Sequence, residues 1–241
     1  MAAWGGYPQT VNYSTVNIAK GGGSENLLIN PRGKVNQLNE AQGVVAAGQY
    51  FCDGWKAGAA GAEIYVDTDG FRLISGSIVQ LVPNTIEAGR NLRSNMDVIS
   101  GAPVMSINGG TSSEPNGVSA YIQLEISGDN SKFSRVILAE SVEVPIYQQS
   151  PDELEPCKRF LIIGDSDIWF TLKSSNAGQI NVDFPEMAAV PALTVGYNSA
   201  FEASWTSVTK SAFTLHKYSY FSSGYTANNV AVNSFILDAR P

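Results

Sequence analysis

The sequence predicts an all-β protein with two modules: a β-sandwich over residues 26–149, and a smaller β module over 150–241 that opens with one short connecting helix. Short stretches that alternate apolar and polar residues recur along most of the chain, and this is the period of a half-buried strand. Asp-Gly, Asn-Gly and Gly-Asp-Asn sequences separate them, and these residues tolerate the positive φ of tight turns. With 241 residues, the chain is long enough to bury a substantial core.

Residues 1–25 are expected to form a tether that precedes both modules. Residues 10–18 alternate and could form a strand, but the segment is too short for a core of its own and ends in Gly-Gly-Gly-Ser at 21–24, a flexible composition. A disordered tail is one interpretation. We favour a docking peptide whose aromatic side chains fit a partner, because a tail that only aids solubility does not need them, and strand addition is one route for docking. Its candidate docking residues are Trp4, Tyr7 and Tyr13.

Residues 26–147 read as short strands between turns, as expected for a sandwich. The turns are expected at 69–70, 108–110, 116–117 and 128–130. The strands are expected at 49–51, 62–68, 71–74, 77–82, 95–99, 103–108, 118–127 and 135–143.

The one predicted helix covers residues 150–160. Ser150 is suited to the N-cap, Pro151 to the first helical position, and the two acidic residues that follow to the first turn. Lys158 and Arg159 lie near its end, where cations complement the helix dipole.

The remainder of the chain returns to strand patterns. Pro185 and Pro191 bracket a loop, because proline interrupts strand pairing. The strands are expected at 168–173, 179–184, 192–197, 205–208, 212–218 and 233–239.

Charge and hydropathy exclude two classes of partner. The net charge is −7, with no basic excess to release counterions from phosphate, so we expect no binding to nucleic acid. No apolar run reaches the roughly 20 residues that span a bilayer, so we expect no membrane partner. The first residues also lack the charged and apolar regions of a secretory signal.

The two cysteines, Cys52 and Cys157, lie far apart in the sequence and have no metal-type spacing. A disulfide between them is one possibility. Two buried free thiols are the favoured interpretation, because cysteine is among the most buried residue types.

Catalytic patterns are sparse, and we expect no catalytic residue, metal or cofactor. His216 is the single histidine and lies in an alternating strand, where a structural role is expected. Without a second histidine, a His-rich zinc site cannot form. There is no Gly-x-Ser-x-Gly elbow, and the Gly-rich turns lack the lysine of a phosphate loop.

Two carboxylate pairs remain. Asp165 and Asp167 alternate, so they could share one face of a strand, and a glycosidase needs two carboxylates across a saccharide groove. Asp67 and Asp69 flank a turn and could hold calcium, but the later ligands of an EF-hand loop are missing. Ordinary turn chemistry is the favoured interpretation of both pairs.

Aromatic residues of the second module could stack on sugar rings, although most are expected in the core or between subunits. The carbohydrate-binding candidates are Trp169, Tyr197, Trp205 and Tyr218.

Several motifs, in order and spacing, resemble those of phage tail-fibre and related virion proteins. They are Asn-Leu-Leu-Ile-Asn at 26–30, Asp-Gly-Trp at 53–55, the Cys-Lys-Arg-Phe segment at 157–160, and the Val-Asp-Phe-Pro-Glu-Met and Pro-Ala-Leu-Thr-Val segments at 182–187 and 191–195. The resemblance implies that residues 26–149 form a galactose-binding-like jelly roll and that the second module is a small β tip. It also implies a trimer displayed on a virion.

These observations lead to the expectation of a non-enzymatic virion appendage, a tail or head fibre. Residues 1–25 would contact other virion proteins, and the β modules of a homotrimer would contact glycans of the host surface. One alternative is a capsid or tail decoration protein without a receptor role. The enzymatic alternative is a polysaccharide depolymerase, which would use a carboxylate pair.

Overall fold

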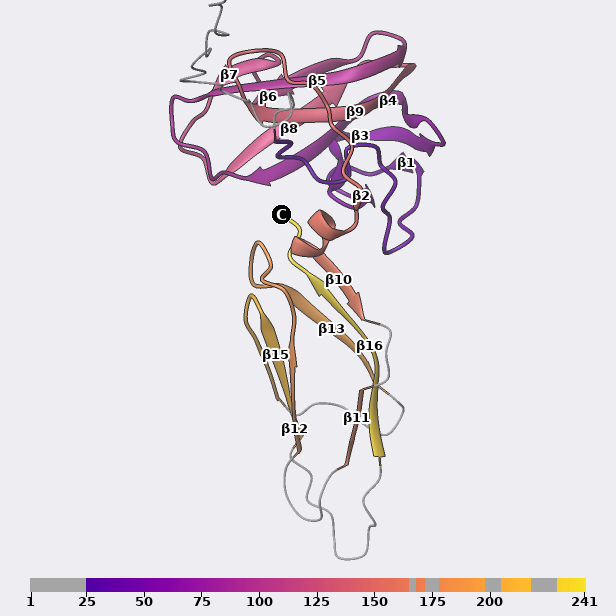
Figure 1. Cartoon of the computed structure of the whole chain (residues 1–241). Coiled ribbons are helices and arrows are strands. Elements are labelled where there is room, and N and C mark those ends of the chain that lie inside the picture. Colours follow the sequence, from indigo (N-terminus) through magenta and orange to yellow (C-terminus); the bar gives the residue numbers. More distant parts are fainter. Residues whose placement is uncertain (1–24, 165–167, 172–177, 198–204, 218–228) are drawn as a thin grey trace, which may run out of the picture.

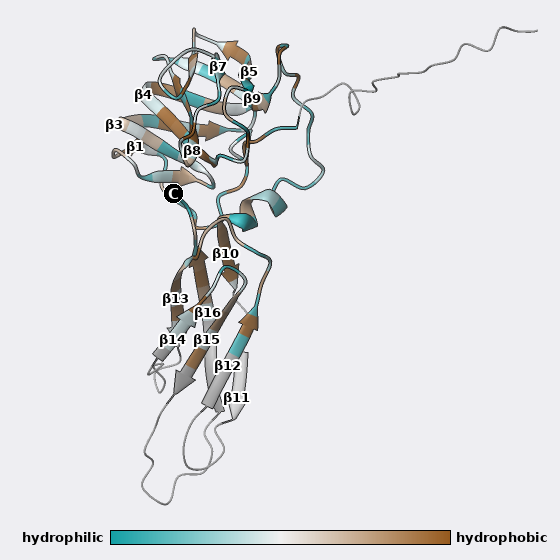
Figure 2. Ribbon diagram, turned by 90° about the vertical axis from the view of Figure 1, so that its left-hand side faces the viewer, coloured by the Kyte–Doolittle hydropathy of each residue, from teal (hydrophilic) through white to brown (hydrophobic). Residues whose placement is uncertain are grey.

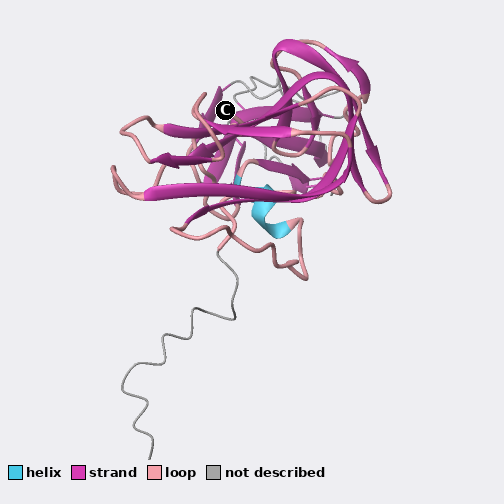
Figure 3. Ribbon diagram, turned by 90° about the horizontal axis from the view of Figure 1, so that it is seen from above, coloured by secondary structure: helices cyan, strands magenta, loops and turns pink. Residues whose placement is uncertain are grey.

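The computed structural model describes residues 25–164, 168–171, 178–197, 205–217 and 229–241. They form two β lobes placed end to end, and the C-terminal end of the chain lies at the waist between them (Figure 1). Strands make up nearly all of the regular structure, with one short helix beside them (Figure 3). The strands pair antiparallel in both lobes, which confirms the all-β prediction. The docking residues Trp4, Tyr7 and Tyr13 lie outside the described residues.

The upper lobe is built from one nine-stranded sheet, in the order β1-β3-β4-β9-β5-β7, with β2 on β3, β8 on β4 and β6 on β8. The predicted strands at 71–74 and 77–82 are a single strand, β4. Two three-residue strands, β1 and β7, escape prediction. The nine strands are β1 (Gly43–Val45), β2 (Tyr50–Cys52), β3 (Trp55–Asp67), β4 (Gly70–Pro83), β5 (Asn91–Ser100), β6 (Val104–Ile107), β7 (Ser113–Pro115), β8 (Tyr121–Ser127) and β9 (Ser131–Glu140).

Strand β4 changes partner along one edge. Its residues 71–73 pair with β9, whereas residues 77–83 pair with β8. The sheet continues from β8 to β6 and from β9 to β5 and β7. The two ends meet at the turn after β6, where the backbone N–H of Ile107 donates to the carbonyl of Thr111 at 2.9 Å. The sheet therefore wraps around one core, as in a sandwich.

Four aromatic side chains occupy the centre of that core, and each is fully buried: Phe51, Trp55, Phe71 and Phe133. The Phe71 ring lies 5.3 Å from Trp55 and 5.6 Å from Phe133, between centroids. Such pairs add about 0.5–1.5 kcal/mol to the free energy of burying their area. The alternate residues 122, 124 and 126 of β8 are also fully buried, as the period of two requires.

A seam opens where β9 leaves β4, and residues 26–31, the plug segment, fill it. The backbone N–H of Val136 in β9 donates to the carbonyl of Pro31 at 3.1 Å. The side chain of Asn26 then substitutes for a strand. Its Nδ2 donates to the Val136 carbonyl at 2.9 Å, and its Oδ1 accepts from the Leu138 N–H at 3.1 Å.

On the side of the seam formed by β4, a side-chain amide again bonds the backbone of the plug segment. Gln80 of β4 is 2% exposed, and its amide bonds the backbone of Ile29 twice: Oε1 accepts from the N–H at 2.8 Å, and Nε2 donates to the carbonyl at 3.0 Å. Gly54 packs against this contact with φ +79°, and a Cβ there would lie 2.6 Å from Ile29. Two side-chain amides thus replace a missing backbone ladder, and position 54 has room only for glycine.

Asn30, one residue before the end of the plug segment, is almost fully buried and bonds several backbone groups. Its Nδ2 donates to the carbonyls of Val35 at 2.7 Å and Asp53 at 3.0 Å, and its Oδ1 accepts from the Val35 N–H at 3.0 Å. Its own carbonyl accepts from Trp55 Nε1 at 2.9 Å. Asparagine also suits the backbone here, because φ is +47°.

The connection between the lobes corrects the predicted helix. An α-helix over 150–160 is wrong: the chain forms a five-residue 3₁₀ helix, η2 (Glu155–Arg159), whose N-cap is Leu154 and not Ser150. The Asp152 carboxylate accepts from the backbone N–H groups of Leu154 and Glu155, which holds a turn instead of a helix. The proline at 156 also lacks the N–H that a helix from 150 would need there. No helix among the described residues is long and apolar enough to cross a bilayer.

The lower lobe has two sheets: β16 pairs with β10, β11 and β13, and β15 pairs with β12 and β14. Apolar residues run along β10, β13 and β16 (Figure 2). In the core, the rings of Phe213 and Phe235 lie 5.2 Å apart. Strands β13 and β14 have their predicted bounds, whereas β10 escapes prediction. The strands are β10 (Leu161–Gly164), β11 (Ile168–Thr171), β12 (Gly178–Asp183), β13 (Ala192–Tyr197), β14 (Trp205–Val208), β15 (Ala212–Lys217) and β16 (Asn229–Asp238).

Both cysteines are free and buried, as favoured from the sequence. Burial raises the pKa of the Cys52 and Cys157 thiols well above their ordinary value, so both stay protonated and unreactive. Cys157 packs with Phe160 and with Ile29 of the plug segment in a small cluster.

Arg240 joins the lobes. Its guanidinium bonds Glu40 of the upper lobe at 2.7 Å and Asp238 at 2.8 Å, and it lies 4.2 Å from the centroid of the Tyr50 ring. The Arg240 side chain is 7% exposed. Burial raises the pKa of Glu40, although the bond to Arg240 opposes the shift, and within the described residues the Glu40 Oε2 atom has no hydrogen-bond partner.

The amide bonds of Asn30 are expected to stabilise the fold more than its backbone conformation does. Asn30→Ala removes the partners of the Val35 N–H and of the Asp53 carbonyl, whereas the Val35 carbonyl keeps the bond from the Asp53 N–H. At about 1–3 kcal/mol for each of the two groups, added to about 1 kcal/mol from the backbone, the free energy of unfolding should fall by about 3 kcal/mol or more. Asn39 is the matched control, because it has a similar φ of +51° but is exposed. Asn39→Ala should cost about 1 kcal/mol from the backbone alone. Urea unfolding of both variants measures the difference in stability. Equal losses of stability would contradict a role of the Asn30 amide bonds.

Arg240→Met should destabilise the protein in a pH-dependent manner. The variant leaves the Glu40 carboxylate buried without its cation, which costs about 3–5 kcal/mol at pH 7.5. Burial raises the pKa of Glu40 in the folded protein, so the penalty is largest above that pKa and fades as the pH falls toward the ordinary value of the unfolded chain. Unfolding curves at several pH values should show the gap to the wild type narrowing in acid. A stability difference between Arg240→Met and the wild type that does not change with pH would contradict this explanation. So would a difference that persists when Glu40→Met is added to Arg240→Met.

Candidate functional site

A groove on the outer face of β5 and β9 is the best candidate for a binding site. It begins at a bulge: Asn95 pairs with Ile137 and Asp97 with Ser134, so β9 has one residue more than β5 over this stretch. Residues 135 and 136 of β9 therefore lie opposite residue 96 alone. Arg135 is the first of the two, and its φ is +52°. The bulge turns the Arg135 side chain out of the sheet, where 55% of it is exposed.

The backbone of Arg135 is strained. The other non-glycine residues with positive φ in the described chain are all asparagines, at 30, 39, 108 and 130. Asparagine tolerates this conformation, but for other L-residues it costs roughly 1–2 kcal/mol. Residues in such conformations cluster at functional sites, which makes Arg135 a candidate.

Neighbouring contacts hold the strained residue in place. On one side the N–H of Val136 is bonded to the carbonyl of Pro31 in the plug segment. On the other side Ser134 is paired with Asp97 of β5. The seam that the plug segment closes therefore also fixes the bulge.

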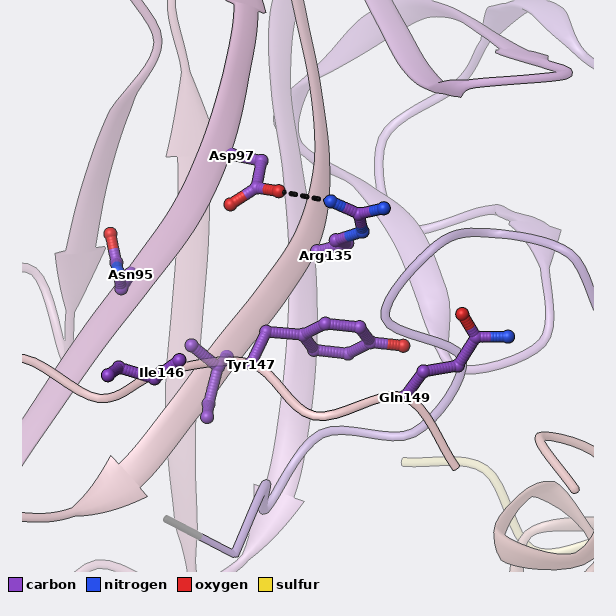
Figure 4. Close-up of a pocket in the computed structure, with 7 residues that line it drawn as sticks. Asn95, Asp97, Arg135, Ile146, Tyr147 and Gln149 are labelled. Carbon is purple, nitrogen blue, oxygen red and sulfur yellow. Dashed lines mark hydrogen bonds and ion pairs between the residues drawn. The ribbon is translucent and has the colours of Figure 1, made fainter. Parts of the chain in front are cut away.

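A first pocket of about 380 Å³ lies on one side of Arg135 (Figure 4). In this view the Tyr147 ring lies below the Asp97–Arg135 pair, and Gln149 lies beyond the tyrosine hydroxyl. Amide, aliphatic and phenol groups dominate its lining, so the pocket offers hydrogen bonds and an aromatic ring with little net charge. The lining residues are Asn95, Asp97, Arg135, Ile137, Ile146, Tyr147 and Gln149.

A second pocket of about 370 Å³ shares Asp97 and Arg135 with the first. Basic residues are more frequent here, and Ile99, which is 46% exposed, adds an apolar wall. The lining residues are Arg32, Lys34, Thr68, Asp69, Asp97, Ile99, Ser134 and Arg135. The Asp97–Arg135 pair thus divides one groove into two pockets.

The dividing ion pair is weak and accessible. Arg135 Nη1 lies 2.8 Å from Asp97 Oδ2, and the side chains are 55% and 53% exposed. Exposed pairs of this kind contribute about 0–1 kcal/mol. The pair alone does not offset the strain at Arg135, which the sheet contacts on both sides hold in place, and it leaves the guanidinium accessible to a ligand.

Glu153, in the connection between the lobes, bonds one lining residue of each pocket. Its Oε1 atom accepts from Arg32 Nε at 2.8 Å and from the Tyr147 hydroxyl at 3.2 Å. Burial and the Glu153 carboxylate raise the pKa of Tyr147 to about 12, so the phenol stays a donor at neutral pH. The amide of Asn95 donates to the Pro145 carbonyl at 3.0 Å and fixes the segment that carries Ile146 and Tyr147.

A larger cleft of about 950 Å³ lies between the plug segment and residues 147–159. Several of its polar side chains already serve the fold: Asn26 and Asn30 bond the backbone, and Glu153 bonds Arg32. We rank the cleft below the groove because the groove holds the exposed Arg135 with its positive φ.

The predicted carbohydrate-binding residues lie in the lower lobe. The backbone of Trp169 in β11 pairs with Ala231, and that of Tyr197 in β13 with Val232, so the two flank β16 at the same level. Trp205 of β14 pairs with His216 of β15 in the other sheet. Tyr218 lies outside the described residues, as do the side chains of the other three. Their sugar contacts therefore stay a prediction.

Of the two predicted carboxylate pairs, only Asp67 and Asp69 lie among the described residues. Asp165 and Asp167 lie outside the described residues. Asp67 bonds Arg72 at 3.0 Å and Lys132 at 2.9 Å, and Asp69 bonds Lys132 at 2.7 Å. Protein cations thus occupy the positions that a calcium ion would take at this turn. No group of metal-binding side chains is found within the described ranges.

Sequence patterns did not indicate the groove. Nothing in the residues around 135 distinguishes a bulge from an ordinary strand, because arginine is no marker of positive φ. The run Tyr147-Gln148-Gln149, which joins an aromatic to two amides between the modules, was the one available signal.

Comparison of the chain with known protein families, with curated proteins and with solved structures finds no match in any of the three.

The strain at Arg135 can be measured with two substitutions that remove the same side chain. Arg135→Gly relieves the positive φ, whereas Arg135→Ala keeps it, so the glycine variant should be more stable by about 1 kcal/mol. Arg93, which lies in the regular part of β5, is the control. There the order should reverse, because glycine weakens a strand interior by roughly 0.5–1 kcal/mol relative to alanine. The same order at both positions would remove the evidence for strain.

Proposed function

We propose that this protein is a non-enzymatic appendage of a phage virion, a tail or head fibre, that attaches to a saccharide of the host surface through the groove around Arg135. The observation that supports attachment is a strained and exposed arginine between two pockets, with a weak ion pair as its internal partner. Residues 1–25 would contact other virion proteins, and the assembly would be a homotrimer.

The groove has the chemistry that a sugar requires. Planar polar groups of asparagine, aspartate, arginine and glutamine can bond adjacent hydroxyls, and a tyrosine ring can pack on the apolar face of a pyranose. Both pockets fall in about the 300–1,000 Å³ range of small-molecule sites. The groove is also open, as binding along a surface polysaccharide demands.

The motifs that resemble tail-fibre proteins coincide with the residues on which the fold depends. Residues 26–30 form the plug segment, and Asp-Gly-Trp at 53–55 bonds and packs against it. A resemblance in residues of this kind supports a shared architecture, and on this basis we propose the placement on a virion.

Binding without cleavage is supported by the state of the acidic groups in the groove. A glycosidase needs a carboxyl group that donates a proton and a second carboxylate free to act as nucleophile or base. In the groove, Asp97 is paired with Arg135 and Asp69 with Lys132. Both carboxylates are about half exposed and bonded to cations, whereas the proton donor of a glycosidase lies in an apolar pocket.

Binding of the purified protein to host-surface polysaccharides tests the proposal. Arg135→Gly should weaken binding by roughly tenfold or more, since a charge-assisted hydrogen bond is lost, without a loss of stability. Arg90→Ala is the matched control, because it removes another exposed, ion-paired arginine near the end of the same strand pair but outside the groove. The chain length of the polysaccharide should not change. Oligosaccharide release would favour the depolymerase, and a particle-bound protein without saccharide affinity would be a decoration protein.

A further inference from the structure

The two pockets of the groove differ in charge. Amide and phenol groups line much of the first pocket, whereas Arg32 and Lys34 join Arg135 around the second. This concentration of cations stands out in a protein whose net charge is −7. A general attraction for anions is not expected of such a protein, so a local one needs a local reason.

The cations of the second pocket have unused donors. An arginine has five N–H donors and a lysine three. Hydrogen bonds among the described residues use Arg135 Nη1, Arg32 Nε, and two donors of Lys34, whose Nζ bonds the carbonyls of Asp67 and Thr68 at 2.7 and 2.8 Å. Lys34 binds carbonyls and no carboxylate in this part of the chain, so its charge is not neutralised by an ion pair.

The acidic groups near the pocket do not cancel this charge. Asp69 is bonded to Lys132, which does not line the pocket, and Asp97 is bonded to Arg135. Arg32 is matched by Glu153 on the waist side. The positive charge of Lys34 is left over.

We propose that the second pocket binds the anionic group of an acidic sugar, a carboxylate, while the first pocket holds a neutral neighbouring unit. Arg135 lies between them and bonds both units, and Lys34 and Arg32 bond the carboxylate. The inference rests on the proposed saccharide attachment and names its ligand class: an acidic oligosaccharide of two or more units.

Matched pairs of acidic and neutral saccharides test this class. The probes are 3′-sialyllactose against lactose, and the trimer of α-1,4-galacturonic acid against its methyl ester. The acidic member of at least one pair should bind roughly tenfold more tightly, and the preference should shrink as ionic strength rises. Titration calorimetry on the full chain measures both effects.

Two charge-matched variants locate the binding. Lys34→Met should reduce the preference for the acidic member to about threefold or less while leaving the neutral member unaffected, because it removes the unneutralised cation. Lys210→Met, an exposed lysine of the lower lobe, makes the same change in net charge and should have no effect. A preference that survives in the Lys34 variant would overturn the inference.

The failure of this inference differs from that of the proposed function. Neutral saccharides or polysaccharides that bind in an Arg135-dependent manner, with no preference for acids, would overturn the ligand class and leave attachment intact. The absence of binding to both pairs and to host polysaccharide would overturn both.

Discussion

The fold depends on closing the seam beside β4. One strand edge is shared by two partners, because β9 pairs with the first part of β4 and β8 with the last. The backbone groups exposed at such a division must find partners or forfeit free energy. The plug segment supplies them through the amides of Asn26 and Gln80, which imitate a strand on either side. Asn30 then anchors the segment to the turn that holds Trp55, at the centre of the aromatic core.

The groove and the waist follow from the same closure. The carbonyl of Pro31 holds Val136, the residue next to Arg135, so the bulge is fixed by the plug segment from one side. Arg32, directly after the plug, bonds Glu153 and thereby orients Tyr147 in the groove. Ile29 of the plug packs with Cys157 and Phe160, directly before the first strand of the lower lobe. A contact made for stability therefore also places the residues that we propose to bind saccharide.

Sequence patterns predicted the fold and missed the candidate site for one reason. Strands such as β13 and β14 are visible because alternation and turn residues are properties of neighbouring positions. The groove combines residues near 32, 97, 135 and 147, and no local pattern connects them. The prediction of sugar stacking rests on residue type alone. The structure gives only the strand pairing of Trp169, Tyr197 and Trp205, so their sugar contacts stay a prediction. The predicted helix failed because a favourable capping pattern at Ser150 competed with the turn at Asp152 and the proline at 156.

The sequence by itself determined that this chain is built of strands and turns, and it favoured a short connection between two modules and buried free thiols over a disulfide. Each of these follows from local period, turn chemistry or residue type. Tertiary structure alone decided the role of the Asn-Leu-Leu-Ile-Asn motif, the left-handed backbone of Arg135 and the groove around it. Asn26 acts on residues 110 and 112 positions away, and Arg135 is forced into its conformation by pairing on both sides. Interactions over such separations exist only once the sheet has closed, so the sequence cannot display them.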